Sequence, residues 1–294
     1  MSLSGGAGAR ARIQLTYLWR HGRRADFDRP QRFTEFVQWR KLFDRRPDQP
    51  VLMDKVAAKA RVEQALGPEW VIPFAWHGPS LPNVASFDGR IIVKARHGCN
   101  QNVVLRHRPN QADWNALCKQ ANGWLAKPYG AWLDEWAYRD TQRGIVAEPL
   151  IGEGVRLPID YKIYVFGGRA THVQVHLGRG RSHRWFLHDR QFRPLVRKDE
   201  APDRPHSLPA MLKAAETLSQ GRDFLRVDFY EQDRKPLFGE FCLYPGSGLD
   251  PFAADWIDHA LGDLWREALP IRQCTSGANR GVPQEDGSIA MANA

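Results

Sequence analysis

The chain has 294 residues, and its 42 Lys and Arg against 33 Asp and Glu give a formal net charge of +9. Because 43% of the residues are apolar and 11% aromatic, the chain can form a hydrophobic core, which excludes global disorder. No stretch approaches about 18 uninterrupted apolar residues, so the sequence predicts no membrane-spanning helix. The first residues lead into no apolar segment, which argues against a secretory signal. A sequence pI near 9.6 favours an anionic partner such as nucleic acid, phosphates, an acidic polymer or a membrane surface.

Cysteine usage indicates the compartment. The four cysteines, Cys99, Cys118, Cys242 and Cys274, lie far apart and form no C-x-x-C pair. This spacing excludes a zinc ribbon and a thioredoxin-type motif, and four cysteines in a chain of this length do not indicate a disulfide framework. The sequence therefore predicts a reduced, cytoplasmic protein.

The two ends of the chain are rich in small and polar residues. We expect residues 1–11 to be loose and residues 271–294 to form a disordered tail. Between them, mixed three- and four-residue apolar steps predict a helix over 32–43 with a basic outer face. A second helix is expected over 53–66, where a Gly-Pro pair stops it, and 70–73 should be extended and partly buried.

From residue 90 onward, segments of period two alternate with helical ones. Strands are expected over 90–95, 102–105, 144–151, 160–166, 170–177, 224–230 and 236–244. Helices are expected over 111–125, 208–218 and 252–269. Gly167-Gly168 is the strongest turn signal and predicts a hairpin between two of these strands. Hairpins with helices between them indicate an α+β fold and not a regular βαβ alternation.

The last predicted hairpin carries the sharpest chemical signal. If its loop spans 233–235, Asp228 lies directly opposite Glu240, and like charges facing each other across strands are destabilising. In a regular strand Phe238 and Glu240 share a face, so aromatic neighbours should keep the carboxylates out of open water. A divalent cation bound by the two carboxylates would remove the repulsion. The alternative is a salt-bridge network of Arg226, Asp228 and Glu240.

Lys94 is the second candidate, because it lies in an apolar strand where a lysine is rarely buried without a partner. Its ammonium would neutralise phosphate oxygens, and Gly98 in the following turn would let backbone N–H groups approach the phosphate. The alternative is an edge-strand lysine that extends to solvent.

Two weaker segments complete the candidates. Asp160 and Lys162 share one strand face, either at a site or as an exposed, self-compensating pair. The segment 148–150 is an apolar strand end that either offers backbone groups to a base ring or only ends the strand. No Walker A, full G-x-G-x-x-G or G-x-S-x-G pattern is present.

In their order and spacing, these motifs resemble the ATP-grasp superfamily, and within it the TupA-like type of teichuronopeptide biosynthesis. The resemblance extends over about three quarters of the chain, from about residue 32 to 252. The segments that carry it are 33–45, 53–55, 70–73, 93–98, 148–150, 160–162, 226–230 and 238–240. It implies two α+β subdomains that hold a nucleotide between antiparallel sheets, after an N-terminal helical extension. The corresponding divisions are 1–50, 51–148 for the small subdomain, 149–270 for the core subdomain, and the tail 271–294.

The resemblance also implies roles for individual residues, with ATP and Mg²⁺ as cofactors. The residues implied in nucleotide binding are Lys55, Lys94, His97, Gly98, Glu148, Pro149, Leu150 and Asp160. Lys162 and Arg226 would be catalytic, facing phosphate or an acyl-phosphate, and Asp228 and Glu240 would hold the metal. One position departs from the family: Cys242 stands where an Asn or Thr is common, and a thiol is a poor magnesium ligand.

The implied activity is an ATP-dependent ligase that activates a carboxylate as an acyl-phosphate for attack by an amine or thiol. The family context adds cell-surface polysaccharide or glycopeptide synthesis, so that an acidic glycan would suit the basic chain. Two alternatives stay open: a phosphotransferase on the same fold, and a non-enzymatic basic protein that binds an acidic polymer. We expect no specific nucleic-acid partner and no transmembrane segment, with peripheral membrane contact compatible with the charge.

Overall fold

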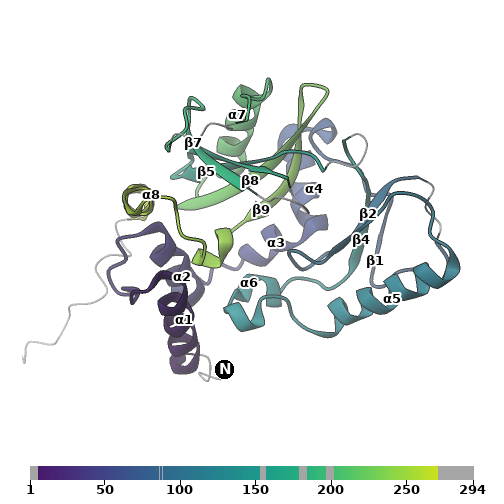
Figure 1. The fold of residues 1–294 in the computed structure, drawn as a ribbon, viewed down its shortest axis with the longest axis horizontal. Helices are drawn as coiled ribbons and strands as arrows, with labels where there is room; N and C mark the ends of the chain where they lie inside the picture. The colour runs from purple at the N-terminus through teal and green to yellow at the C-terminus, as the bar shows by residue number, and fades with distance from the viewer. Residues whose placement is uncertain are drawn as a thin grey trace, which may run out of the picture.

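The computed structural model describes residues 6–85, 87, 89–152, 157–178, 184–196 and 202–270, and it contains two antiparallel sheets (Figure 1). The small sheet has the order β1-β4-β2-β3, with β1 Trp76–Gly78, β2 Ile91–Ala95, β3 Asn102–Leu105 and β4 Ile145–Pro149. The large sheet has the order β7-β6-β5-β8-β9, with β5 Asp160–Phe166, β6 Arg169–Leu177, β7 Arg184–Asp189, β8 Phe224–Gln232 and β9 Lys235–Cys242. The predicted α+β class is confirmed.

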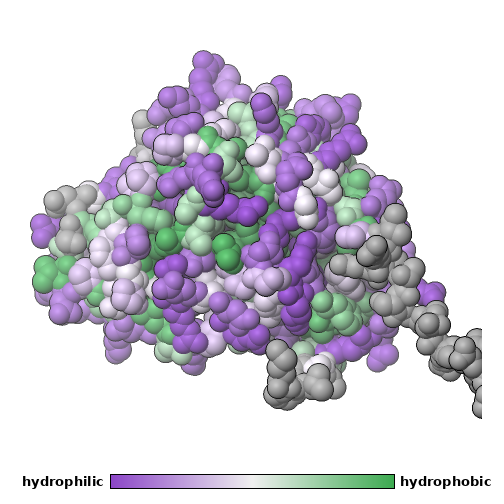
Figure 2. Space-filling view, turned by 180° about the vertical axis from the view of Figure 1, so that it is seen from behind, coloured by the Kyte–Doolittle hydropathy of each residue, from purple (hydrophilic) through white to green (hydrophobic). Residues whose placement is uncertain are grey.

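Helices surround the two sheets. In chain order they are α1 Gly6–His21, α2 Phe33–Phe43, α3 Gln49–Met53, α4 Lys55–Leu66, α5 Gln111–Ala126, α6 Trp136–Arg139, α7 Leu208–Leu218 and α8 Asp255–Ala268. Short 3-10 turns lie at η1 Pro68–Trp70, η2 Ala131–Leu133 and η3 Pro245–Gly248. No helix in the described part of the chain is both long and apolar enough to cross a membrane. Seen from behind, the surface is mostly hydrophilic, with apolar side chains in separate patches (Figure 2).

The expected elements are largely confirmed, with three corrections, and the structure adds β1, β7, α3 and α6, which the sequence did not predict. The basic outer face expected for the helix over 32–43 is wrong in part, because Arg40 and Lys41 of α2 are buried. The prediction of a loose start was wrong for residues 6–11, because residues 6–21 form α1, which buries Ile13 and Tyr17 although small residues dominate its first turns. Residues 1–5 lie outside the described residues. The helix expected over 53–66 is interrupted at Asp54, whose side chain caps α4 by accepting hydrogen bonds from the backbone N–H groups of Val56 and Ala57. The expected disordered tail lies outside the described residues.

The two sheets have separate hydrophobic cores. The small sheet packs against α5 around Val93, Trp114 and Ala147. The larger core contains the large sheet together with α2, α7 and α8, and also residues of α3 and α4 such as Met53 and Val62. The subdomain boundaries stay a prediction, but α4 shares the larger core although it was grouped with the small subdomain.

The predicted pairing of Asp228 with Glu240 is confirmed, but the turn that produces it differs from the predicted one. The turn has two residues, Asp233 and Arg234, both with positive φ, instead of the expected three-residue loop. A bulge at Gly239 then restores the register, so that Asp228 does pair with Glu240 while Phe229 pairs with Phe238. Phe238 consequently does not share a face with Glu240, which corrects the sequence expectation.

One face of the large sheet is covered over only part of its length by aromatic side chains. Phe33 of α2 and Trp265 of α8 pack on Phe166 and Phe224, at one end of the central strands. Further along the same face, β5 and β8 carry charged side chains in place of apolar ones. This change from aromatic to charged residues on one sheet face marks the candidate site.

Candidate functional site

The small sheet contributes Lys94 and Glu148 from neighbouring strands. Along β2, Ile91 and Val93 are buried toward α5, so Lys94 lies on the opposite face. Glu148 of β4 is 3% exposed, and its Oε2 atom lies 2.6 Å from the Lys94 Nζ atom. The predicted Lys94 is therefore held by a carboxylate on its own sheet and does not extend freely to solvent.

Helix α4 adds two lysines to this cluster, because positions 55 and 59 lie on one helix face. The Lys55 Nζ atom donates to the Gly98 carbonyl oxygen at 2.5 Å. Lys59, which the sequence analysis did not single out, lies 2.7 Å from the Glu148 Oε1 atom and donates to the Ile72 carbonyl. The spacing K-V-A-A-K from Lys55 was the signal that would have found it.

Arg96 fixes the start of α4 to the turn after β2, the turn that contains Gly98. Its guanidinium forms two hydrogen bonds with the Asp54 carboxylate, at 2.7 and 2.6 Å, and its carbonyl accepts the Lys55 backbone N–H at 3.2 Å. Bidentate Arg–carboxylate pairs are geometrically specific. The turn after β2 and the lysine face of α4 therefore hold a fixed relative position.

The large sheet contributes a row of four polar side chains across neighbouring strands. Lys162 of β5 pairs with Gln174 of β6 on one side and with Asp228 of β8 on the other. Asp228 in turn pairs with Glu240 of β9. Directly opposite residues on antiparallel strands share one face, so all four side chains project to the same side.

Asp228 is buried and surrounded by cations. Arg226 donates to its two carboxylate oxygens at 2.7 and 2.8 Å, and Lys162 donates to one of them. The Lys162 Nζ atom also lies 3.3 Å from the Asp160 Oδ2 atom. Burial by itself raises the pKa of the Asp228 carboxyl, but the two cations outweigh it and hold the pKa well below its usual value.

Glu240 behaves differently from Asp228. Its side chain is half-buried, and none of the residues that the structure describes donates a hydrogen bond or forms an ion pair with it. Of the expected salt-bridge network of Arg226, Asp228 and Glu240, only the ion pair of Arg226 with Asp228 forms. The second partner of Asp228 is Lys162 and not Glu240. The carboxylate of Glu240 is left available for a ligand at this edge of the row.

The two halves of the site meet at the turn that follows Lys94. Burial lowers the pKa of the Lys55 ammonium, while the carboxylates of Glu240 on the large sheet and Glu148 on the small sheet raise it, so Lys55 interacts with one carboxylate from each sheet. Burial and the Glu240 carboxylate raise the pKa of the Cys99 thiol in the turn to about 11, against the opposing charge of Lys162. The structure thus brings the predicted lysines of the small sheet and the carboxylates of the large sheet to one place.

Other predicted residues take supporting positions. His97 is fully buried, and its Nε2 atom lies 3.1 Å from the Trp124 carbonyl of α5, so its ring anchors the turn to that helix. A Cβ atom at Gly98 would overlap the Gln101 Oε1 atom and lie 3.2 Å from the Tyr129 ring, so the turn fits a glycine closely at this position. At the end of β4, Pro149 is exposed, and the Leu150 N–H donates to the Arg90 carbonyl at 2.9 Å. The adenine role of this segment stays a prediction.

Cys242, the position that departs from the family, lies opposite Arg226 on β8 and is 8% exposed. Burial raises the pKa of its thiol to about 12, with the Arg226 charge opposing that rise. The side chain is therefore a neutral thiol at physiological pH, which is a weak donor for magnesium.

The residues fit a magnesium ion only together with a ligand. Among the described residues, no group of three or more His, Cys, Asp and Glu side chains could hold a metal ion by itself. Glu240 nevertheless supplies a carboxylate with no ion pair among the described residues, and it faces Asp228, whose two oxygens already accept hydrogen bonds from Arg226 and Lys162. Magnesium in proteins is commonly bound by one or two carboxylates together with substrate phosphates, and the carboxylates at this position agree with that mode of binding.

Charge is divided between the two sides of the site. On the small-sheet side, Lys55, Lys59 and Lys94 face one carboxylate, Glu148. On the large-sheet side, Lys162 and Arg226 face three carboxylates, Asp160, Asp228 and Glu240. The small-sheet side therefore carries surplus positive charge and the large-sheet side surplus negative charge.

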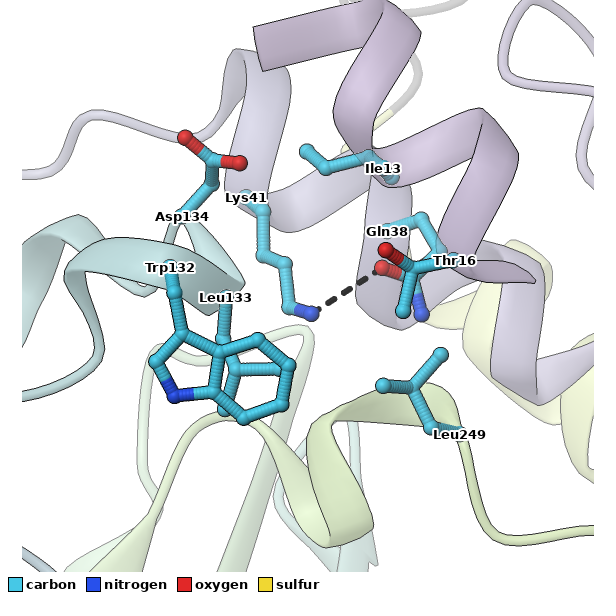
Figure 3. A pocket seen from close by; sticks show the side chains of 8 residues that line it. All are labelled: Ile13, Thr16, Gln38, Lys41, Trp132, Leu133, Asp134 and Leu249. Atoms are coloured by element: carbon cyan, nitrogen blue, oxygen red, sulfur yellow. Dashed lines mark hydrogen bonds between the residues drawn. The ribbon is translucent and has the colours of Figure 1, made fainter. Parts of the chain in front are cut away.

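A small pocket elsewhere is structural. It lies between α1, α2, η2 and η3, has room for about one water molecule at a volume of about 10 Å³, and is lined by Ile13, Thr16, Gln38, Lys41, Trp132, Leu133, Asp134 and Leu249 (Figure 3). The Lys41 ammonium in it donates to Gln38 Oε1 at 3.0 Å and to the carbonyl and hydroxyl oxygens of Ser247 at 2.8 and 2.7 Å. With three donors satisfied, Lys41 connects α2 to η3 and has none left for a ligand.

Comparison with known protein families identifies the family of the chain. The profile of the TupA-like ATPgrasp family matches residues 35–266, so the chain belongs to the TupA-like ATP-grasp family. No curated protein matches it.

Solved structures that match the chain include several ligases. The D-alanine–D-alanine ligase from Bacillus anthracis complexed with ATP is 13% identical with a TM-score of 0.43, over 74% of this chain and 66% of that one. The ATP-grasp ligase PsnB complexed with a minimal precursor is 12% identical with a TM-score of 0.41, over 76% and 62%. The L-amino acid ligase from Bacillus licheniformis is 12% identical with a TM-score of 0.43, over 74% and 48%. The chain thus spans between about half and two thirds of the length of these proteins.

Proposed function

We propose that the chain is an ATP- and Mg²⁺-dependent ligase that activates a carboxylate as an acyl-phosphate and joins it to an amine or a thiol. The observation that carries the proposal is the division of charge across the site, three lysines on one side and three carboxylates on the other. Phosphoryl transfer needs little covalent chemistry from the protein; it needs positioning and neutralisation of charge. Membership of the TupA-like ATP-grasp family supports the same activity.

Each residue would act on a particular part of the reactants. Lys55 and Lys94 would neutralise the phosphates above the turn that contains Gly98, and Asp228 and Glu240 would hold the magnesium. Magnesium would supply charge neutralisation between the phosphates and the large sheet. Arg226 and Lys162, fixed by Asp228, would present positive charge to the transferred phosphoryl group and the substrate carboxylate.

The acceptor that we propose is a cell-surface polysaccharide or glycopeptide precursor with acidic groups. The net charge of +9 supports an anionic substrate, because a basic protein attracts one over long range. The reaction would then take place on the cytoplasmic side, with the precursor or its membrane carrier as partner.

The test is trapping of the activated acid. The purified protein is incubated with ATP, Mg²⁺, hydroxylamine and a panel of carboxylic acids, and ADP, orthophosphate and hydroxamate are measured, with the product identified by mass. A ligase gives all three, whereas a phosphotransferase gives ADP without orthophosphate and a phosphorylated acceptor. Glu240→Gln should abolish the reaction, and Glu69→Gln, at an exposed position, should leave it unchanged. Absence of any nucleotide turnover or binding would leave the binding-protein alternative.

A further inference from the structure

Glu148 has an unusual environment for a single buried carboxylate, because each of its oxygens has its own lysine. Oε1 lies 2.7 Å from the Lys59 Nζ atom, and Oε2 lies 2.6 Å from the Lys94 Nζ atom. A single cation would be enough to neutralise the Glu148 carboxylate. The second lysine therefore requires an explanation.

The two lysines are held very differently. The Lys59 side chain is 5% exposed, donates also to the Ile72 carbonyl, and has its Nζ atom 4.2 Å from the centre of the Phe74 ring. The Lys94 side chain is 19% exposed, and Glu148 is the one acceptor that it reaches among the residues that the structure describes. Lys59 is fixed in place, whereas Lys94 can exchange its partner by rotating its side chain.

We infer that Lys59 is a positioning residue that acts as the permanent counter-ion of Glu148, so that Lys94 can leave this carboxylate for a nucleotide phosphate. The inference rests on the proposed function, since it needs an anionic ligand at Lys94. Without Lys59, transfer of Lys94 to a phosphate would leave Glu148 buried and unpaired, and an unpaired buried carboxylate is strongly disfavoured. Lys59 removes that obstacle while Glu148 keeps Lys94 in position when no ligand is bound.

This role predicts a proton signature. The charged groups that face Glu148 are Lys55 and Lys59 from α4 and Lys94 from β2, with Glu63 near Lys59. When Lys94 moves to a phosphate in a variant that lacks the Lys59 charge, Glu148 must take up a proton, because burial without a nearby cation favours the neutral acid. In the wild type Lys59 keeps Glu148 ionised, so nucleotide binding requires no proton at this position.

The experiment is isothermal titration calorimetry of the full chain with the β,γ-imido analogue of ATP and Mg²⁺. Running it in two buffers of different ionisation enthalpy gives the protons taken up per ligand bound. For Lys59→Met we expect uptake of close to one proton more than the wild type, and a dissociation constant raised by about tenfold or more. Lys59→Arg should restore both values, and Arg61→Met, at an exposed position of the same helix, should change neither.

Two further variants keep the test decisive. Lys59→Gln removes the charge but keeps a donor for the Ile72 carbonyl, so it carries the same prediction should Lys59→Met fail to fold. The double variant Lys59→Met/Glu148→Gln should lose the extra proton, because the group that takes it up is gone. Unchanged affinity and unchanged proton uptake in the folded Lys59 variants would overturn the inference. Failure of the wild type itself to bind the analogue would instead overturn the proposed function, and the inference with it.

Discussion

Two clusters in this molecule look alike and differ in one respect that decides their roles. In the small sheet, Glu148 lies between Lys59 and Lys94, and in the large sheet, Asp228 lies between Lys162 and Arg226. Each is a buried carboxylate with two cations. The large-sheet cluster is sealed, with the Lys162 side chain 2% exposed, whereas the Lys94 side chain is 19% exposed.

The Asp228 cluster is a rigid scaffold that keeps Lys162 and Arg226 in place before a ligand binds, whereas in the Glu148 cluster Lys94 can leave its carboxylate for a ligand. The Asp228 cluster gains a further carboxylate, Asp160, so its charges balance without a ligand. The Glu148 cluster has surplus positive charge, and Lys55 of the same helix adds to it. In the large sheet, the group free to meet a ligand is Glu240, at the edge of the row and outside the ion pairs.

The largest effect should come from breaking the sealed cluster. Asp228→Asn leaves Lys162 and Arg226 buried beside an uncharged amide, and removal of one partner of a buried pair typically costs about 3–5 kcal/mol of unfolding free energy. Urea unfolding measures the loss, and Asp233→Asn in the exposed turn of the same hairpin is the control. Near-wild-type stability of Asp228→Asn would show that the cluster is not the scaffold described here.

The second prediction concerns pH. Burial raises the pKa of Glu148, but Lys94 and Lys59 outweigh it and lower the pKa from 4.5 to about 2, which corresponds to about 3 kcal/mol. A carboxyl with a lowered pKa in the folded state stabilises the protein fully above pH 4.5, and that contribution is lost as the pH falls through 2. About 2 kcal/mol should therefore disappear between pH 6 and pH 3.

The measurement is the difference in unfolding free energy between the wild type and Glu148→Gln across that pH range. Other carboxylates titrate in both proteins and cancel in the difference. A difference that does not change with pH would mean that Glu148 is not held ionised by the two lysines.

The third prediction tests whether the exposed cluster is the ligand site. Lys94→Ala should remove most of the rise in melting temperature that ATP with Mg²⁺ produces, because stabilisation by a ligand falls as its dissociation constant from the folded state approaches the ligand concentration. The unliganded variant should stay folded, since Lys59 still neutralises Glu148. A thermal scan with and without nucleotide decides it, with Lys119→Ala as the control at an exposed position of α5. An undiminished shift would assign Lys94 to the sheet alone.

The smallest effect is expected at Glu240. Glu240→Gln should change the unfolding free energy by less than about 0.5 kcal/mol, or raise it slightly, because Glu240 has no ion pair among the described residues and lies opposite a like charge. Chemical unfolding of this variant beside Asp228→Asn gives the comparison directly. A loss of several kcal/mol would place Glu240 inside the scaffold and remove it from the proposed metal site.

Local patterns in the sequence were enough for most elements. The hairpin around Gly167-Gly168 and the helix α7 follow from turn chemistry and apolar period, which act over a few neighbouring residues. The facing of Asp228 and Glu240 followed from strand parity, although a two-residue turn and a bulge at Gly239 replaced the expected loop. A two-residue turn with a bulge and a three-residue loop without one both place Asp228 opposite Glu240. The pairing was therefore predictable from the sequence, although the bulge was not.

Helix α1 shows where local patterns failed. Gly and Ala fill its first turns, and this composition resembles a loose terminus, but Ile13 and Tyr17 are buried against the rest of the protein. Packing of an apolar face supplies most of the stability of a helix in a protein. The partners of that face come from separate elements, such as Thr34 of α2, whose hydroxyl lies 2.9 Å from that of Tyr17, and Leu249, which lines the same pocket as Ile13. Contacts of this kind leave no signal in the sequence of the helix itself.

The residue types of the site, the strands that carry them and the family of the chain could all be predicted from the sequence. The pairing of the charges could not, because it depends on the folded molecule: Lys94 and Lys59 share Glu148, and Lys162 and Arg226 enclose Asp228. The physical reason is that ion pairing depends on distances between side chains from separate elements and on burial. Neither quantity is encoded in local spacing, so a carboxylate that is free and one that is sealed look the same in the sequence.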